Sequence, residues 1–323
     1  MLLTAVQFAA CSSSENELSQ EERVPVAFSL GFDVSVTRAN IFDNIWPDNT
    51  NITISNGINT FGYTTSNTSS AAASGAAVSL TPTVTTDKTH QFYWPVSNPS
   101  WKFSAWYPAG DTPTLLRTVP ANQSVKTGES GLTEDDFTGL DFLYMPPTAA
   151  IWRSTVELAL KHQLARVIVT VNTTMTEKHE TVTNIEFGGG RLGLTATGTQ
   201  NEAGQISWAV SGDNKITHMR ERTTDADRNV NRYVFECLLP PQSNSTTTDE
   251  LIKIYTTGAI KEGTTDTPEP RYYTYKNAFD LQPGYQYTYN LIISEEGKVL
   301  MGSVELTAWD IRTGVDDTQT ITR

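Results

Sequence analysis

The chain has 323 residues, which is enough for one large domain or two ordinary domains with their own cores. Its formal net charge is −13, with 23 Lys and Arg against 36 Asp and Glu. This balance argues against a nucleic-acid-binding protein, and against a protein held to anionic membranes by surface charge. Thr, Ser and Asn are abundant, as is typical of β-rich exported proteins.

The N-terminus carries the pattern of an export signal. Residues 1–10 are mostly apolar and end in Ala9 and Ala10, which is typical of the end of a signal peptide. Cys11 follows directly and resembles the acylated Cys of a bacterial lipobox, where two or three acyl chains give stable anchoring. Residues 12–22 are polar and acidic, as expected for a tether. No basic residue precedes the apolar stretch, so we expect translation to start upstream of Met1. The alternative is an ordinary buried segment with a chance Cys.

Residues 24–36 form the most regular pattern in the chain. Apolar side chains occupy every second position, at Val24, Val26, Phe28, Leu30, Phe32, Val34 and Val36. This period of two predicts a half-buried β-strand of 13 residues. At ~3.3 Å per residue it would span about 40 Å, roughly twice the usual length. Arg38 and Ala39 follow directly after the alternation ends.

The rest of the first half contains short aromatic segments. Residues 92–95 and 101–108 predict strands that each end at a proline, and residues 141–145 predict a third strand. Pro146-Pro147 then makes a natural domain boundary.

The second half predicts more regular strands, separated by Gly-, Pro- and Ser-rich turns. The expected strands cover residues 155–172, 182–187, 206–210, 233–239, 251–256, 272–275, 285–293 and 299–309. The turn at 295–298 predicts a hairpin between the last two. No segment predicts an amphipathic helix longer than about two turns. We therefore expect an all-β fold of two tandem β-sandwiches. Residues 1–22 form the tether, 23–150 the first sandwich and 151–323 the second, with a short tail.

One segment has part of the spacing of a calcium loop. Oxygen ligands at Asp225, Asp227, Asn229 and Glu236 correspond to positions 1, 3, 5 and 12 of such a loop. However, Val230 replaces the required Gly, and Glu236 falls within an expected strand. A polar turn is the alternative interpretation. The four His are too widely separated for a zinc pair, at His90, His162, His179 and His218. The sequence therefore predicts no metal site and no cofactor.

Catalytic patterns are weaker still. Ser130 lies in a Gly-Glu-Ser-Gly segment without a supporting His and Asp. The carboxylate pairs Asp135-Asp136 and Asp316-Asp317 are expected to be solvated surface groups. Cys237 lies in an apolar run and is expected to be a small buried hydrophobe. We do not expect an enzyme.

Six motifs in order resemble the fimbrillin (Mfa-like) family, the subunits of type V pili in Bacteroidales. They are the lipobox at Cys11, the first strand ending at Thr37-Arg38-Ala39, the aromatic segments 92–95 and 103–108, the segment 141–145, the His162-Gln-Leu-Ala165 step into the strand at 167–171, and Pro283-Gly284-Tyr-Gln-Tyr287 with the closing residues 304–309. The most specific match is the His162 step. From the residues alone, His162 is expected to be a satisfied core or interface residue, and the resemblance implies the same.

The resemblance implies a fold and a mechanism. The sandwiches would be of the transthyretin-like type, and the protein would be an outer-membrane lipoprotein that becomes part of a cell-surface fimbrium. A trypsin-like, Arg-specific surface protease would cut between Arg38 and Ala39, removing the first strand. A strand from another pilus subunit would then fill the groove, as in donor-strand addition. The fibre could bind a host or bacterial surface ligand.

The role within the fibre stays open, because the tail after Trp309 is short and has only Ile311, Val315 and Ile321 as aliphatic residues. It is compatible with a tip, minor or anchor subunit as well as with a stalk subunit. An alternative function is a surface glycan-binding lipoprotein, in which Trp101, Trp106 and Trp152 would stack on sugars, although core packing is the more usual role of such residues.

Overall fold

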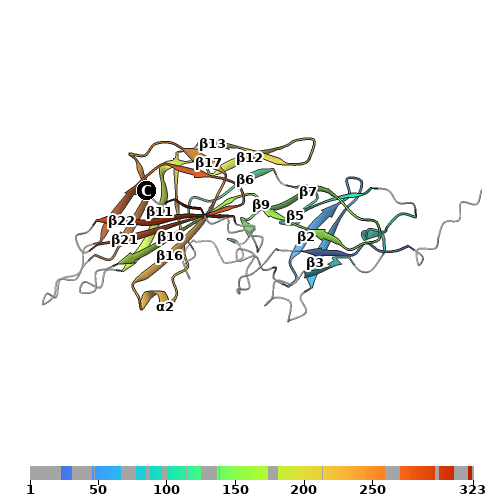
Figure 1. The fold of residues 1–323 in the computed structure, drawn as a ribbon, viewed down its shortest axis with the longest axis horizontal. Helices are drawn as coiled ribbons and strands as arrows, with labels where there is room; N and C mark the ends of the chain where they lie inside the picture. The colour runs from blue at the N-terminus through green and yellow to red at the C-terminus, as the bar shows by residue number, and fades with distance from the viewer. Residues whose placement is uncertain are drawn as a thin grey trace, which may run out of the picture.

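The computed structural model describes residues 23–30, 46, 48–66, 78–84, 88–96, 100–113, 115–124, 137, 139–173, 181–212, 214–258, 270–294, 298–308 and 319–321. These residues form two β lobes side by side along the long axis of the molecule (Figure 1). Two short helical elements have defined bounds, the 3-10 helix η3 (Lys88–His90) and the α-helix α2 (Asp225–Arg228). The predicted all-β fold class is confirmed. Among the described helices, none has the length and apolar character to span a membrane.

The first lobe is built on one eight-stranded sheet in the order β8-β1-β4-β3-β2-β5-β7-β9. Its strands are β1 (Phe28–Leu30), β2 (Asn51–Ser55), β3 (Thr60–Ser66), β4 (Val78–Pro82), β5 (Lys102–Tyr107), β7 (Leu143–Ala149), β8 (Val156–Leu158) and β9 (Lys161–His162). The strands β8 and β9 lie at opposite ends of this order but are joined only by residues 159 and 160. Because a connection of that length spans only about 11 Å, the two ends must lie close together. The sheet therefore curls around its core, where the sequence analysis expects a sandwich of two sheets.

The core of the first lobe is rich in aromatic side chains. Phe28, Tyr63, Phe92, Trp94 and Phe103 are all buried in one cluster. All of them except Tyr63 come from segments that the sequence predicts as strands, and residues 102–107 do form β5. Phe92 and Trp94 lie instead in an irregular segment that pairs with the chain at Pro25.

The second lobe contains two main sheets that face each other. A six-stranded sheet has the order β15-β16-β10-β21-β22-β23, and a four-stranded sheet has the order β14-β11-β18-β19. The strands of these sheets are β10 (Ala165–Thr173), β11 (Val182–Leu192), β14 (Lys215–His218), β15 (Arg220–Glu221), β16 (Arg232–Leu239), β18 (Glu250–Thr256), β19 (Arg271–Lys276), β21 (Tyr285–Ile293), β22 (Val299–Ala308) and β23 (Gln319–Ile321). The apolar core lies between them and includes Val167, Val169 and Val171 of β10 with Ile252 and Ile254 of β18.

Two small sheets complete this lobe. One has the order β13-β12-β6 and the other pairs β17 with β20. Their strands are β6 (Leu116–Thr118), β12 (Thr195–Gln200), β13 (Ile206–Ser211), β17 (Gln242–Asn244) and β20 (Phe279–Leu281). The pairing of Ile293 with Val299 confirms the expected neighbouring strands at the end of the chain, although residues 295–297 lie outside the described part.

The junction between the lobes differs from the expected division at residues 150 and 151. Both β8 and β9 belong to the first sheet, and after them the chain returns at Leu164 to the second core, to which Val119 and Phe137 also belong. The earlier strand β6, by contrast, pairs with β12 of the second lobe. A third cluster, Trp106, Phe142 and Tyr144 with Ile206 and Trp208, packs the β12–β13 hairpin against the first lobe. The transthyretin-like type of the two units stays a prediction.

Candidate functional site: the groove of the first strand

The predicted site residues are described only in part. Cys11, Arg38 and Ala39 lie outside the described residues, as do Phe32, Val34 and Val36 of the first strand. Residues 23–30 are described, and they show how the first half of that strand sits in the fold. The buried face begins at Val26, because Val24 is 40% exposed.

The strand β1 lies inside the first sheet, between two neighbours. It runs antiparallel to β4, with Ser29 opposite Ser79, and parallel to β8, with Phe28 opposite Val156. Just before β1, the chain pairs with the aromatic segment 92–94. Val26 N donates to Phe92 O at 2.9 Å, and Trp94 N donates to Val24 O at 2.8 Å. Pro25 sits between these two bonds, opposite Tyr93, so its missing N–H costs no bond to this neighbour.

The side chain of Phe28 occupies the centre of the first core. Its ring is 3% exposed and meets Tyr63, Phe103 and Phe92 with centroid distances of 5.1, 5.1 and 5.9 Å. All three contacts are edge-on, a preferred geometry for aromatic pairs. Leu30 and Val26 are 1% and 3% exposed. Removing the segment would therefore open an apolar groove that reaches the middle of the core.

The walls of this groove are held independently of β1. Tyr63 on β3 accepts a hydrogen bond from Phe92 N at 3.3 Å, and burial raises the pKa of its hydroxyl to about 12. β3 pairs with β2 and β4, and β2 pairs with β5. By contrast, β8 is the end strand of the described sheet, and its one neighbour in the strand order is β1. Loss of β1 would thus leave β4 with a free edge and β8 without its pairing partner.

His162 is buried, as the sequence predicts. Its Nδ1 lies 2.8 Å from Oδ2 of Asp141, and both side chains are fully buried. The nearby Arg117 lies over the ring of Phe142, 4.2 Å from its centroid. Burial lowers the pKa of Arg117, and the charge of Asp141 opposes this effect. The contact between His162 and Asp141 holds β9, the last strand of the first sheet, two residues before Leu164 of the second core.

The candidate calcium loop does not assemble a metal site. Residues 225–228 form α2, where Asp227 caps the helix together with Thr224 and lies 3.4 Å from Arg232. Glu236 points elsewhere, into the six-stranded sheet. Within the described part of the chain, no three or more His, Cys, Asp or Glu side chains come together in a group that could hold a metal ion. Within this segment, Asp225–Arg228 forms a capped helical turn, and Glu236 pairs with arginines instead of facing that turn.

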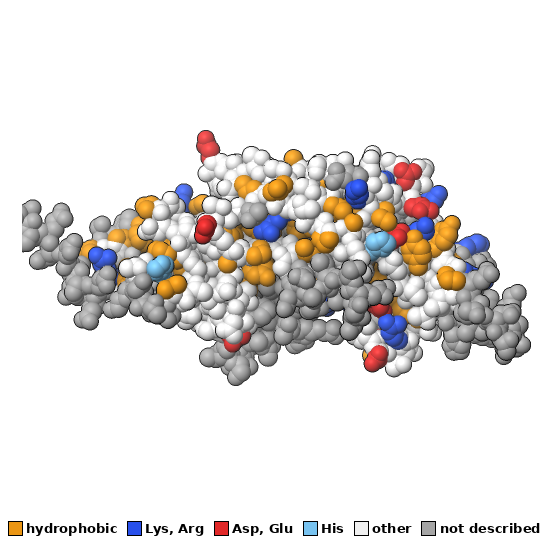
Figure 2. Space-filling view, turned by 180° about the vertical axis from the view of Figure 1, so that it is seen from behind, with side chains coloured by type: hydrophobic (Ala, Val, Ile, Leu, Met, Phe, Trp, Pro, Cys, Tyr) orange, Lys and Arg blue, Asp and Glu red, His pale blue; other side chains and the backbone are white. Residues whose placement is uncertain are grey.

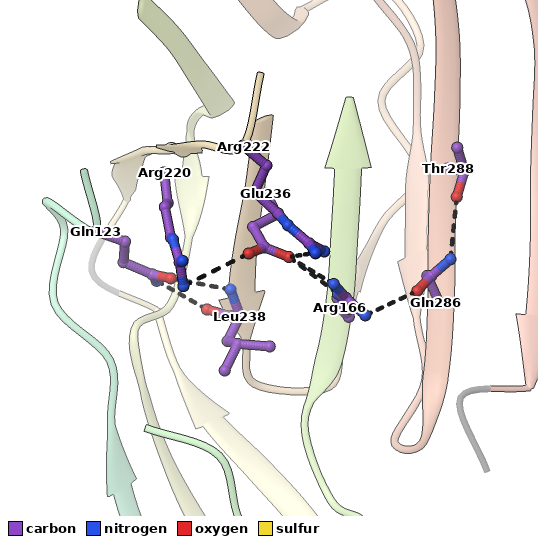
Figure 3. Close-up of polar contacts among 8 residues, drawn as sticks. All are labelled: Gln123, Arg166, Arg220, Arg222, Glu236, Leu238, Gln286 and Thr288. Atoms are coloured by element: carbon purple, nitrogen blue, oxygen red, sulfur yellow. Dashed lines mark hydrogen bonds and ion pairs between the residues drawn. The ribbon is translucent and has the colours of Figure 1, made fainter. Parts of the chain in front are cut away.

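Glu236 instead joins a buried network of arginines (Figure 3). Its Oε2 accepts from Arg166 at 2.7 and 3.1 Å and lies 3.3 Å from Arg222, while Oε1 lies 3.7 Å from Arg220. Arg166 continues the network to Gln286 at 3.2 Å. The network thus connects β15, β16, β10 and β21. The sequence analysis missed it, because its members are far apart in the chain.

Other candidate residues are placed as follows. Cys237 is buried, and burial together with the charge of Glu236 raises the pKa of its thiol. His218 lies 3.6 Å from Glu186. Ser130, His179 and the carboxylate pairs Asp135-Asp136 and Asp316-Asp317 lie outside the described residues.

The three tryptophans of the glycan-binding alternative are not open platforms. Trp106 is 3% exposed and packs between the lobes. Trp101 packs on Phe103, and Trp152 donates its Nε1 hydrogen to Pro95 O at 3.1 Å while its ring is covered by Arg153. These contacts are those of core and near-core residues.

One face of the molecule shows how its basic side chains are distributed. On the face shown in Figure 2, Lys and Arg side chains are scattered among uncharged groups. They form no continuous basic patch on this face, in keeping with the argument against phosphate binding.

Comparison with known proteins agrees with this architecture. The model of the Fimbrillin-like family matches residues 37–309. Among curated proteins, none matches the chain significantly. A proposed cell adhesion protein from Bacteroides uniformis has a similar structure, with a TM-score of 0.55 and 19% identity over 90% of this chain and 99% of the other. A proposed cell adhesion protein from Bacteroides ovatus has a TM-score of 0.56 and 12% identity, covering 88% and 96%. These likenesses concern the fold, and the family match over most of the chain shows that this protein belongs to the Fimbrillin-like family.

Proposed function

We propose that this protein is a subunit of a cell-surface pilus that assembles by exchanging its first strand. It is exported as a lipoprotein through Cys11, an Arg-specific protease cuts after Arg38, and a strand of another subunit replaces the released segment. The observation that carries the proposal is the position of β1, whose Phe28 fills the centre of the core while β4 and β8 flank the strand on both sides.

The energetics support such an exchange. Val26, Phe28 and Leu30 are all at most 3% exposed. At about 1.5–3 kcal/mol for each side chain, their burial contributes about 5–9 kcal/mol. A trimmed subunit would therefore hold an open apolar groove and two unpaired strand edges, which is a strong drive toward pairing with another chain. An incoming strand that runs in the direction of β1 would reproduce its antiparallel pairing with β4 and its parallel pairing with β8.

The family match supports the coarser part of this proposal. Members of a fimbrillin-like family are expected to act in fimbriae, and a neighbour of similar fold is described as a proposed cell adhesion protein. The matched range, 37–309, begins after the first strand and ends before the tail. The two segments that strand exchange would use therefore flank the part common to the family.

The tail bears on the role in the fibre. Residues Gln319–Ile321 form β23, which pairs with Val304–Leu306 at the edge of the six-stranded sheet. The tail beyond Trp309 has three aliphatic residues, whereas the first strand has seven alternating apolar residues. As a donor, these residues would bury less apolar surface than the first strand, and the role as a tip, minor, anchor or stalk subunit stays open.

Limited proteolysis tests the proposal. Purified protein is treated with trypsin, and its new N-terminus and SDS-resistant multimers are followed by mass spectrometry and gel electrophoresis. We expect cleavage after Arg38, loss of the first strand and formation of multimers, either alone or with other subunits of the same fibre. Arg38→Ala should block both steps.

The matched control is Arg23→Ala, which removes an exposed cleavage site in front of the strand. This variant should still lose residues up to Arg38 and assemble. Protein that is cut after Arg38 but keeps its first strand bound and stays monomeric in the presence of its partner subunits would contradict the proposal.

A further inference from the structure

A cavity of about 750 Å³ opens in the second lobe, beside the strand pair β17–β20 and the strands β21 and β22. It lies far in the sequence from the first strand and belongs to the other core. Cavities of about 300–1,000 Å³ are the usual size of small-molecule binding sites. The cavity is therefore large enough for a ligand of one to a few rings.

A stripe of three tyrosines lines the cavity. Tyr285, Tyr287 and Tyr289 alternate along β21 and therefore point to the same face of the sheet. Their exposure falls along the strand, from 38% at Tyr285 to 6% and 3%. Val304 and Leu306, opposite Tyr289 and Tyr287 on β22, line the same cavity. The stripe gives the cavity a buried apolar floor and one aromatic ring at its mouth.

Polar groups form the rim. Asn244, Asn277, Asp280 and Gln282 line the cavity together with two serines, one in β17 and one directly after it. Gln282 N donates to the hydroxyl of Tyr287 at 2.7 Å, and Gln282 Nε2 lies 3.1 Å from the carboxylate of Asp280. Amide and carboxylate groups beside an aromatic ring offer both hydrogen bonds and a stacking surface.

Arg191 holds both sides of this rim in place. Its Nη1 donates to Asn244 Oδ1 at 3.2 Å and to Thr246 O at 2.8 Å, and its Nη2 donates to Asn277 O at 3.1 Å. The guanidinium also lies 5.4 Å from the centroid of Phe279. The guanidinium of Arg191 donates its hydrogen bonds to oxygen atoms of the protein, and Arg191 does not line the cavity. It therefore holds the rim in place without placing a positive charge on the cavity wall. Preorganised polar groups lower the entropy cost of binding.

Charge narrows the class of ligand. Among the residues that line the cavity, Asp280 is the one with a charged side chain. A carboxylate disfavours anionic ligands, and the hydrogen-bonding rim disfavours purely apolar ones. We propose that this cavity binds a neutral saccharide, with a sugar ring stacked on Tyr285 and its hydroxyls bonded to the Asn, Gln and Asp side chains. The inference does not depend on strand exchange, since the groove of β1 lies in the first lobe.

Titration calorimetry with the full chain tests this inference, using lactose, maltose, cellobiose and N,N′-diacetylchitobiose as probes. We expect at least one of them to bind. Tyr285→Ala should weaken that binding by about tenfold, because it removes the stacking ring at the mouth. Tyr285→Phe should retain it, and Asp280→Ala should weaken it several-fold. The matched control is Tyr272→Ala, an exposed tyrosine on β19 that does not line the cavity, and it should bind normally.

Three results would overturn the inference. The first is no binding of any of the four sugars. The second is an equal effect of Tyr285→Ala and Tyr272→Ala on folded protein, with folding checked by circular dichroism. The third concerns the tail, because β23 pairs with the cavity-lining residues Val304 and Leu306. If binding occurs only after residues 309–323 are deleted, the cavity serves the chain's own tail.

Discussion

The rings of Phe28 and Phe103 meet edge to face, with 5.1 Å between their centroids and 84° between their planes. This contact joins the first strand to β5, two elements that are far apart in the sheet order. It shows that β1 contributes to the interior of the first lobe as well as to its sheet. The strand that the proposed cut after Arg38 would release is thus also central to the core.

Phe28→Ala should destabilise the untrimmed protein strongly. Truncating a buried Phe typically costs about 3–5 kcal/mol, and here three aromatic neighbours lose their partner. Denaturant unfolding followed by tryptophan fluorescence measures the loss. Val24→Ala is the control, because Val24 is 40% exposed and should cost less than about 1 kcal/mol. Equal losses for the two variants would contradict the buried position of Phe28.

A synthetic peptide of residues 24–36 should rebind to protein that has been trimmed after Arg38. The peptide restores the apolar contacts and the pairing with β4 and β8. At a concentration about 100-fold above its Kd, it should stabilise the protein by about 2.7 kcal/mol, which is measured as a rise in Tm. A peptide with Phe28→Asp is the control and should leave Tm unchanged. Equal stabilisation by both peptides would argue against insertion into the core.

Glu236→Gln should destabilise the second lobe. The substitution leaves Arg166, Arg220 and Arg222 without the carboxylate that they surround, and breaking a buried pair typically costs about 3–5 kcal/mol. Chemical denaturation provides the measurement. Glu221→Gln is the matched control, since Glu221 pairs with Arg228 in a partly exposed position and should change stability by less than about 1 kcal/mol. A similar cost for both would mean that the buried network is not specially stabilising.

Stability should fall as the pH rises above about 10. Burial raises the pKa of Tyr63 and of Tyr287 to about 12 in the folded protein, whereas an unfolded tyrosine titrates near 10. Between these values the folded state holds more protons, so each rise in pH favours unfolding; below pH 10 these groups contribute no pH dependence. Urea unfolding at several pH values measures the slope. Tyr63→Phe should reduce that slope, and an unchanged slope would contradict the raised pKa of Tyr63.

Much of the fold was predictable from local patterns. The alternation at residues 24–36 predicted a strand with Phe28 and Leu30 on its buried face, and the apolar run at 167–171 predicted the central strand β10. Burial on one face of a strand forces a period of two on the sequence, so such elements can be recognised without a structure. His162 was likewise predicted to be buried, but the sequence did not predict that Asp141 would be its hydrogen-bonding partner.

The tertiary structure alone decided which of these elements meet. Residues 116–118 leave the first lobe to pair with β12, and β8 and β9 extend the first sheet beyond the Pro146-Pro147 boundary. Glu236, placed by spacing in a calcium loop, lies among three arginines instead. Pairing and ion contacts between distant residues depend on how whole sheets pack, and no local periodicity encodes that. The sequence by itself therefore determined many of the strands and the buried face of residues 26–30, whereas only packing decided that β1 lies between β4 and β8.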